Sequence, residues 1–296
     1  MNEVKKLADR YDIAIVGSGP AGLSAAINAK IRNKNIIVFG SKDLSSKLTK
    51  APKINNYLGF YNVTGEKLKE EFEKHIKAMD ISISYERINA IYAMGDYFAL
   101  MVNEKMYEAT SVIIATGVEY AKPLNGEESY LGKGVGYCAT CDAPLYKEKT
   151  VAIIGYNHEA EEDANFVSEL ASKTYYIPMY NGSYNLKENI EILKDKPLEI
   201  QGDIFVSKLI LRNSTIATDG VFILKDSVPP GQLVPGLEII DGHIKTDRNM
   251  RTNIPGCFAA GDCVGKPYQY IKSAGEGQIA SLSAVSYVDS LKNSRR

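Results

Sequence analysis

The residues best suited to chemistry lie near the middle of the chain, where Cys138, Cys141 and Asp142 occur within one short run. Two cysteines two residues apart can close a small redox-active disulfide or supply half of a zinc site. If a helix begins here, its positive end would lower the pKa of the attacking thiol. Asp142 is placed to exchange a proton with a departing thiolate, although it is also a common structural residue at a helix start. We predict redox disulfide chemistry with these three catalytic residues.

A zinc site would need further ligands, and the sequence offers none nearby. The remaining cysteines, Cys257 and Cys263, belong to a different motif, and no histidine lies beside the pair. We therefore expect no metal, and we expect Cys257 and Cys263 to be small buried residues. His158 and His243 have no partner that the sequence identifies, so we expect them to be structural or exposed.

The composition limits the classes of protein that the chain can belong to. With 296 residues, 45% of them hydrophobic and 24% charged, it is typical of a globular protein. A net charge of −1 gives no global attraction to nucleic acid or to an anionic membrane, so we expect neither as a partner. No apolar run approaches the length of a membrane helix, residues 1–10 are charged without the apolar core of a signal peptide, and four cysteines are not the number expected of a secreted disulfide framework. We expect a cytoplasmic protein.

A glycine-rich turn near the N-terminus lies in a complete strand, turn, helix and strand pattern. The pattern has a buried strand at 11–16, an alanine-rich helix at 23–30 and a second strand at 35–39. Between the first strand and the helix lies the run Gly17, Ser18, Gly19, Pro20, Ala21 and Gly22. Its glycines allow a tight turn, a close approach of pyrophosphate and close helix packing, while free N–H groups face the anion. We predict dinucleotide binding rather than a turn without a ligand.

The other elements must position these motifs. We expect a loop at 47–60, an amphipathic helix at 66–79 and a small antiparallel sheet within 81–110. A buried strand then ends in Ala115-Thr116-Gly117, and the character of the chain changes at 117–123, which indicates a domain crossover.

The second half of the chain repeats part of this plan. We expect a strand at 150–155, a helix at 159–172 and a strand at 174–177. Short strands and a charged helix are expected in 187–224, and a final helix at 275–291.

Motifs along nearly the whole chain resemble those of the low-molecular-weight thioredoxin reductases. They are GSGPAG at 17–22, ATG at 115–117, CATCD at 138–142, and PGCFAAGDC with YQYIKSAGEGQ near the C-terminus. The resemblance implies an α/β fold with two Rossmann-like domains of the three-layer ββα type. A discontinuous FAD domain would comprise 1–117 and 226–296. A smaller inserted nucleotide-type domain, 118–225, would carry the CxxC.

The resemblance also implies which residues bind FAD. Asp262 would bond to the ribityl chain, Gln269 and Tyr270 would lie near the flavin ring, and Thr49 and Asn56 belong to the flavin-side loop. Because the strand at 35–39 ends without the usual acidic residue, Ser41 would bind the ribose more weakly. The expected set is Gly17, Ser18, Gly19, Pro20, Ala21, Gly22, Ser41, Leu48, Thr49, Asn56, Ala115, Thr116, Gly117, Gly261, Asp262, Gln269 and Tyr270.

The second glycine turn departs from the family pattern. Asn157 occupies the position of the glycine that allows close approach, and Tyr156 adds bulk beside it. Glu159, Glu161, Glu162 and Asp163 crowd the first helical turn. Carboxylates there stabilise an empty helix but would repel a pyrophosphate. The next strand ends without a basic residue for a 2′-phosphate or an acidic residue for a 2′-hydroxyl, so we expect neither NADPH nor NADH.

This combination resembles the pyridine-nucleotide-independent thioredoxin reductases, including the clostridial-type ferredoxin-dependent flavin enzymes. The resemblance implies that reduced ferredoxin supplies electrons to FAD, that thioredoxin is the substrate and that the protein is a homodimer. The donor rests on analogy alone. Reduced flavin would attack Cys141, Cys138 would attack the thioredoxin disulfide, and Asp142 would be the general acid. The alternatives are an NADPH-dependent thioredoxin reductase with unconventional contacts and a non-catalytic flavin redox sensor.

Overall fold

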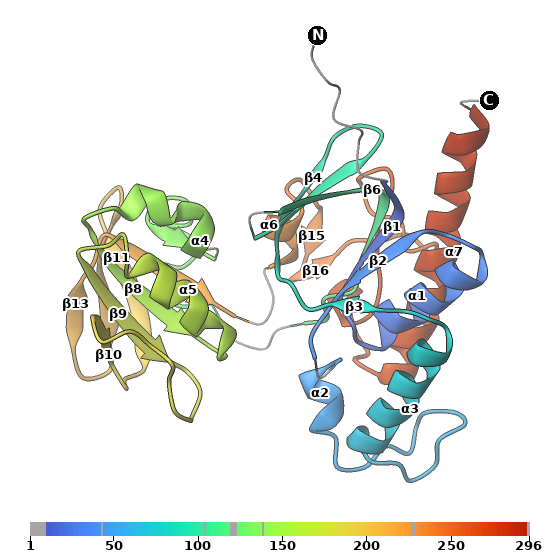
Figure 1. Cartoon of the computed structure of the whole chain (residues 1–296), viewed down its shortest axis with the longest axis horizontal. Coiled ribbons are helices and arrows are strands. Elements are labelled where there is room, and N and C mark those ends of the chain that lie inside the picture. The colour runs from blue at the N-terminus through green and yellow to red at the C-terminus, as the bar shows by residue number, and fades with distance from the viewer. Residues whose placement is uncertain are drawn as a thin grey trace. The chain divides into compact units, whose positions relative to one another are not determined.

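The computed structural model describes residues 10–42, 44–103, 105–118, 123–137, 139–225 and 229–294 (Figure 1). The chain forms two compact units. The first unit comprises Met1–Val118 and Pro229–Arg296, and the second unit comprises Glu119–Val228. No helix in the described part of the chain is long and apolar enough to span a membrane.

The first unit is built on a seven-stranded sheet. Five of its strands lie in parallel, while the β5–β4 hairpin continues the sheet in antiparallel fashion beyond β6. The strand order is β3 (Ile83–Ser84), β2 (Ile36–Phe39), β1 (Tyr11–Val16), β6 (Lys105–Ile114), β5 (Phe98–Val102) and β4 (Ile88–Ala93), and β17 (Cys257–Ala259) also pairs with β6. The central strands are almost fully buried, because apolar residues face both sides of the sheet.

Two helices from opposite ends of the sequence pack together beside this sheet (Figure 1). They are α1 (Pro20–Ile31) and α7 (Tyr270–Ser294). A Cβ added at Gly277 would lie 2.0 Å from the Ala21 carbonyl oxygen, so glycine is required for this close approach. Smaller elements complete the unit: α2 (Ser46–Thr49), α3 (Gly65–Ala78), α6 (Pro230–Leu233), β15 (Ile239–Ile240), β16 (His243–Ile244) and η2 (Asp262–Val264).

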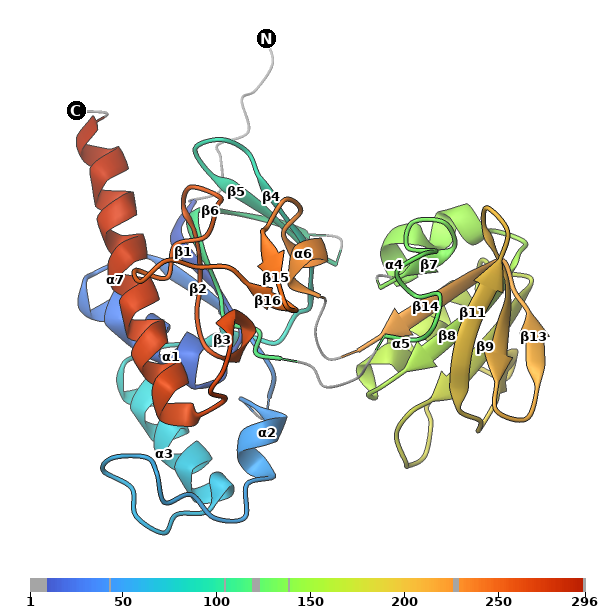
Figure 2. The same ribbon diagram turned by 180° about the vertical axis from the view of Figure 1, so that it is seen from behind.

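The second unit has three layers: helices, a parallel sheet and a small antiparallel sheet (Figure 2). The parallel sheet has the order β10 (Ile190–Ile192), β9 (Lys173–Pro178), β8 (Thr150–Gly155), β14 (Gly220–Leu224) and β7 (Val135–Gly136). The other layers are β11 (Pro197–Gly202), β12 (Val206–Leu211) and β13 (Thr215–Ala217) on one side, and α4 (Ala139–Asp142), η1 (Ala143–Tyr146) and α5 (Glu159–Val167) on the other.

Alternation along β8 explains these layers. Ala152 and Ile154 belong to the core shared with the antiparallel sheet, whereas Val151 and Ile153 belong to the core shared with the helices. Successive side chains of a strand point to opposite faces, so one buried strand feeds both cores. The predicted α/β fold with three-layer Rossmann-like domains is confirmed.

Some predicted elements were wrong in type or length. No helix occurs within residues 187–224, all of which the structure describes, because Ile190 and Ile192 follow the period of a strand. Helix α5 ends at Val167 rather than at residue 172. Directly after this end, the Ser168 hydroxyl donates to the Asn165 carbonyl. The loop expected at 47–60 begins within the short helix α2, and the last helix starts five residues earlier than predicted, at Tyr270.

Candidate functional site

The carboxyl ends of three adjacent parallel strands bring together motifs that are far apart in the sequence. Val16 of β1 pairs with Ile114 of β6, and Ile114 also pairs with Ala259 of β17. The Gly17–Gly22 run, the Ala115–Gly117 turn and the Gly261–Asp262 turn follow these strand ends directly. Ligands of open α/β sheets bind at such an edge.

The helix N-terminus at this edge is open. Gly17 has φ +118°, and a Cβ there would lie 2.1 Å from the Ala115 carbonyl oxygen, so only glycine fits the turn. By contrast, a Cβ at Gly19 would meet no atom within 4 Å. Gly19 provides no side-chain cap for α1, and the first turn of α1 has no acidic residue. The free N–H groups and the open space fit the pyrophosphate of a dinucleotide.

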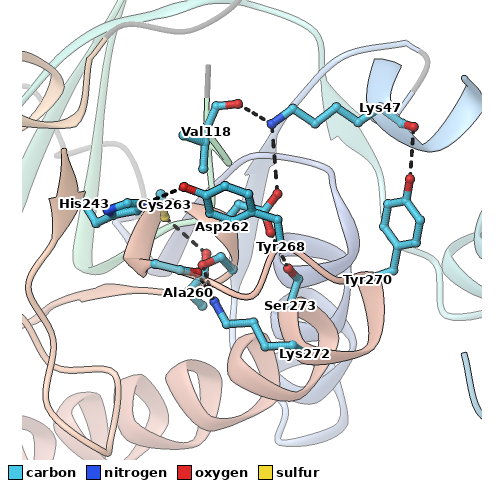
Figure 3. Close-up of polar contacts among 12 residues, drawn as sticks. Lys47, Val118, His243, Ala260, Asp262, Cys263, Tyr268, Tyr270, Lys272 and Ser273 are labelled. Carbon is cyan, nitrogen blue, oxygen red and sulfur yellow. Dashed lines mark hydrogen bonds and ion pairs between the residues drawn. The ribbon is translucent and has the colours of Figure 1, made fainter. Parts of the chain in front are cut away.

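Asp262 lies in a polar cluster at the same edge (Figure 3). The Ser273 hydroxyl donates to Asp262 Oδ1 at 3.1 Å, and Lys47 Nζ lies 4.0 Å from Asp262 Oδ2 while donating to the Val118 carbonyl. Lys272 Nζ donates to the Gly261 carbonyl at 3.0 Å and thereby ties the turn to α7. The sequence analysis missed Lys47 and Ser273, although Lys47 directly precedes the predicted Leu48.

The other residues predicted to bind FAD have different environments. The Tyr270 hydroxyl donates to the Lys47 carbonyl at 3.0 Å, so the start of α7 is linked to α2. Leu48 is fully buried in a small core with Ile54 and Leu68. Thr49 and Thr116 are half-buried, and Ser41, Asn56 and Gln269 are exposed.

Ser18 has a structural contact that the motif alone did not indicate. Its buried hydroxyl donates to the Leu44 carbonyl at 2.8 Å and accepts from the Ser41 N–H at 3.0 Å. These two hydrogen bonds link the segment that follows β2 to the first glycine turn.

Two histidines have partners that the sequence did not identify. His243 Nε2 lies 2.6 Å from the Tyr268 hydroxyl (Figure 3). His158 Nδ1 lies 2.7 Å from Glu161 Oε1. Both contacts fit the expectation that these histidines are structural or exposed, and their partners come from the folded arrangement. The expectation for Cys257 and Cys263 is confirmed: both are buried, and burial raises the pKa of each thiol to about 12.

The redox segment is described only in part. Cys138 lies outside the described residues, and of Cys141 the backbone alone is described, within α4. Asp142 is the last residue of α4 and is half-buried, and burial raises the pKa of its carboxyl. A Cβ added at Gly136 would lie 3.1 Å from Asp142 Oδ2, so the glycine leaves room for the carboxylate. Among the described side chains, no group of three His, Cys, Asp or Glu residues could hold a metal ion.

The helix N-terminus after β8 is closed by the protein itself. Asn157 Oδ1 accepts the Ala160 N–H at 3.1 Å. Glu161 turns inward, where its carboxylate accepts from the Tyr180 hydroxyl and from the Asn185 N–H at 2.7 Å. The predicted acidic helix start is therefore not uniformly solvated, because the side chain of Glu161 is only 7% exposed.

The tyrosines complete this closure. The Tyr176 hydroxyl lies 2.9 Å from that of Tyr180 and would lie 2.2 Å from a Cβ at Gly155. Burial raises the pKa of Tyr176 to about 12 and also raises the pKa of Tyr180. Burial alone would raise the pKa of Glu161, but hydrogen bonds from Tyr180, Asn185 and His158 outweigh it and lower that pKa. The network is thus a carboxylate that accepts from the Tyr180 hydroxyl and the Asn185 N–H, with Tyr176 hydrogen-bonded to Tyr180 behind it.

Together, the two α/β units, the open glycine turn and the CxxC define the class of flavin-dependent disulfide oxidoreductases. The family of pyridine nucleotide-disulphide oxidoreductases matches residues 11–179 and 184–277. A thioredoxin reductase of Treponema pallidum is 34% identical over 96% of this chain and 99% of its own length. Two structures of a ferredoxin-flavin thioredoxin reductase from Clostridium acetobutylicum each cover 96% of this chain and 99% of theirs, at 61% identity with TM-score 0.92 and at 68% identity with TM-score 0.87.

The chain belongs to the pyridine nucleotide-disulphide oxidoreductase family, and within it to the thioredoxin reductases. The predicted resemblance is confirmed, including the ferredoxin-flavin branch. The family is one of flavoenzymes, which confirms FAD as the cofactor.

Proposed function

We propose that the protein reduces the disulfide of thioredoxin with electrons from reduced ferredoxin, through FAD and a Cys138–Cys141 disulfide. The observation that supports this most directly is the contrast at its two glycine turns. The first leaves an anion site open before α1, whereas Asn157 and Glu161 close the second. The names and 61–68% identities of the Clostridium acetobutylicum structures support the same donor.

The first unit would hold FAD. The N–H groups at the start of α1 would face the pyrophosphate, with Gly19 allowing its approach while Gly17 and Gly22 permit the tight turn and the close helix packing. Asp262, held by Ser273, would accept a ribityl hydroxyl. The remaining predicted residues would line the cofactor, and Lys47 joins them through its contact with Asp262. Bound FAD supplies the two electrons that reduce the disulfide.

The second unit would carry the exchange chemistry. Two electrons and two protons convert the disulfide to two thiols, of which Cys138 attacks thioredoxin as the thiolate. A mixed disulfide forms as one thioredoxin thiolate departs, and the Cys141 thiolate then releases reduced thioredoxin and restores the pair. Asp142 would protonate the departing thiolate, because its raised pKa keeps a proton on the carboxyl to higher pH.

The closed second turn supports the exclusion of pyridine nucleotides. A pyrophosphate would have to displace Asn157 from Ala160 and approach the carboxylate of Glu161. The buried Tyr176 also lies against Gly155. The inserted domain would thus keep the nucleotide-binding fold without its ligand. A homodimer and a cytoplasmic location complete the proposal, the latter from cysteine usage.

Anaerobic mixing tests the donor. The purified flavoprotein is mixed separately with NADPH and with reduced ferredoxin, and flavin absorbance is followed, with an NADPH-dependent thioredoxin reductase as the positive control. Ferredoxin should bleach the flavin and NADPH should not. Rapid bleaching by micromolar NADPH would instead favour the NADPH-dependent enzyme.

The disulfide and its acid are tested by substitution. Cys138→Ser should abolish thioredoxin reduction while ferredoxin still bleaches the flavin. Asp142→Asn should slow thioredoxin reduction by about 100-fold, within the usual range for a general acid. A Cys138→Ser protein that still reduces thioredoxin would contradict the proposed pathway, and a wild-type protein that never reduces thioredoxin would favour the redox sensor.

A further inference from the structure

A buried ion pair lies at the carboxyl edge of the parallel sheet in the second unit. Lys225 follows β14 directly, and its Nζ lies 3.4 Å from Glu127 Oε1. The two side chains are only 6% and 2% exposed. Removing two charges from water is costly, and such a pair is weak evidence for stability by itself. The function of the pair is therefore better judged from the parts of the chain that Glu127 contacts than from the energy of the pair itself.

The Glu127 carboxylate binds three separate parts of the chain. Besides Lys225, its Oε1 accepts the Tyr137 hydroxyl at 2.6 Å, and its Oε2 accepts the Leu124 N–H at 2.7 Å. Tyr137 directly precedes Cys138 in the sequence. Leu124 lies shortly after residue 118, where the first unit ends, and Lys225 lies shortly before residue 229, where that unit resumes. One carboxylate thus connects the redox segment with both ends of the inserted unit.

The tyrosine that joins this pair to Cys138 is firmly held. Tyr137 is 8% exposed and packs in the core between the parallel and antiparallel sheets. Its short bond to a charged acceptor is of the strong, charge-assisted kind. Lys225 Nζ also lies 5.7 Å from the centre of the Tyr156 ring, so the altered second glycine turn contacts the same cation.

We propose that Glu127 and Lys225 are positioning residues for disulfide exchange, which act on Cys138 through Tyr137. Lys225 holds the Glu127 carboxylate in place, that carboxylate accepts the Tyr137 hydroxyl, and Tyr137 anchors the backbone directly before Cys138. This inference rests on the proposed role of Cys138. Thiol–disulfide exchange requires three sulfur atoms in alignment, so a small displacement of one sulfur lowers the rate of exchange strongly.

Tyr137→Phe tests the link with the least disturbance, because the ring remains and the hydroxyl is lost. Tyr130→Phe is the matched control: its hydroxyl donates to the Gly202 carbonyl at 2.7 Å in the same unit, away from the redox segment. Cys138 of the dithiothreitol-reduced protein is alkylated with iodoacetamide, and its rate is read by peptide mass spectrometry. Tyr137→Phe should alkylate faster and reduce thioredoxin about tenfold more slowly. The control should stay within about twofold of wild type for both rates.

The ion pair is tested by a change of charge and its compensation. Lys225→Met keeps an unbranched side chain that is one atom shorter but leaves Glu127 buried without its cation, so Cys138 should be disturbed at least as much as by Tyr137→Phe. The double variant Lys225→Met with Glu127→Gln also removes the buried carboxylate. The amide can accept from the Leu124 N–H and donate to the Tyr137 hydroxyl, so the double variant should recover most of both rates.

Thermal unfolding and the flavin spectrum of each variant accompany these rates. Altered alkylation and exchange in Tyr137→Phe, with recovery in the double variant, would support the proposal. A lower melting temperature with unchanged alkylation and exchange in Tyr137→Phe would show a purely structural pair and overturn it. Should Lys225→Met fail to fold, Tyr137→Phe decides alone. If wild-type protein does not reduce thioredoxin, the proposed function fails, while the alkylation rates still test the positioning.

Discussion

The two strand–glycine–helix turns of this molecule follow the same backbone plan and differ in what neutralises the helix N-terminus. In the first unit, Gly19 faces open space before α1. In the second unit, the Asn157 amide accepts from Ala160, and the inward Glu161 carboxylate accepts from Tyr180 and Asn185. An N-terminus carries partial positive charge and free N–H groups that need a partner. The pyrophosphate of FAD would supply that partner at the first turn, and the chain's own side chains supply it at the second.

This difference suggests how, under the proposed function, a nucleotide-type domain would lose its ligand without losing its fold. The strands and the helix of the second unit still pack as three layers, because their apolar faces remain. The polar groups at this helix start have hydrogen-bond partners within the chain, so they stay satisfied. The predictions below test this contrast between the open and the closed turn, from the largest expected effect to the smallest.

Gly19→Val should weaken FAD binding by about 100-fold or more, which corresponds to about 2.7 kcal/mol. The backbone of Gly19 is extended, so valine fits the fold, but its side chain would occupy the open space in front of α1. FAD titration of the apoprotein measures the affinity, and circular dichroism checks the fold. Asn157→Val makes the same change at the closed turn and should retain full flavin. A Gly19→Val protein that purifies saturated with FAD would contradict the assignment.

Glu161→Ala should destabilise the second unit by about 2–3 kcal/mol, because it removes charge-assisted hydrogen bonds and leaves buried donors unpaired. Urea unfolding followed by circular dichroism measures the change. Glu162→Ala, at the exposed neighbouring position, should stay within about 0.5 kcal/mol of wild type. Equal effects of the two substitutions would mean that the inward carboxylate does not stabilise the closed turn.

The stability of the closed turn should depend on pH through Glu161. Its folded pKa is lowered below the usual 4.5, so its contribution is present above that value and is lost as the pH falls through the folded pKa. The melting temperature of wild type should therefore fall more steeply below pH 4.5 than that of Glu161→Gln. Parallel curves for the two proteins would assign the acid sensitivity to other carboxylates.

Asn157→Ala should cost about 1 kcal/mol, because it leaves the Ala160 N–H without its side-chain acceptor. Asn157→Asp, which retains an acceptor oxygen, should cost much less. Neither variant should allow NADPH to bleach the flavin, since Glu161 and Tyr180 still close the helix start. Recovery of NADPH reduction in Asn157→Ala would show that this one side chain, rather than the network, excludes the nucleotide.

Local sequence patterns predicted much of the fold because the relevant interactions are local. The strands at 11–16 and 150–155 appear with the predicted bounds, since a buried strand needs a continuous apolar run. The first glycine turn follows in the same way from its spacing. The charged stretch after residue 187 was wrongly predicted to contain a helix. Its strand β10 is only three residues long, so the alternation that indicates a strand is too short to recognise in the sequence.

By itself, the sequence determined that one glycine turn keeps its small residues while the other carries Asn157 and an acidic helix start, because residue types at fixed spacing set the space and charge at a helix start. Only the tertiary structure decided that Glu161 turns inward to Tyr180, that Lys47 approaches Asp262, and that Lys225 meets Glu127 beneath Tyr137. These partners are distant in sequence, and a charged side chain becomes buried only where the fold provides its counter-charge or hydrogen-bond donors.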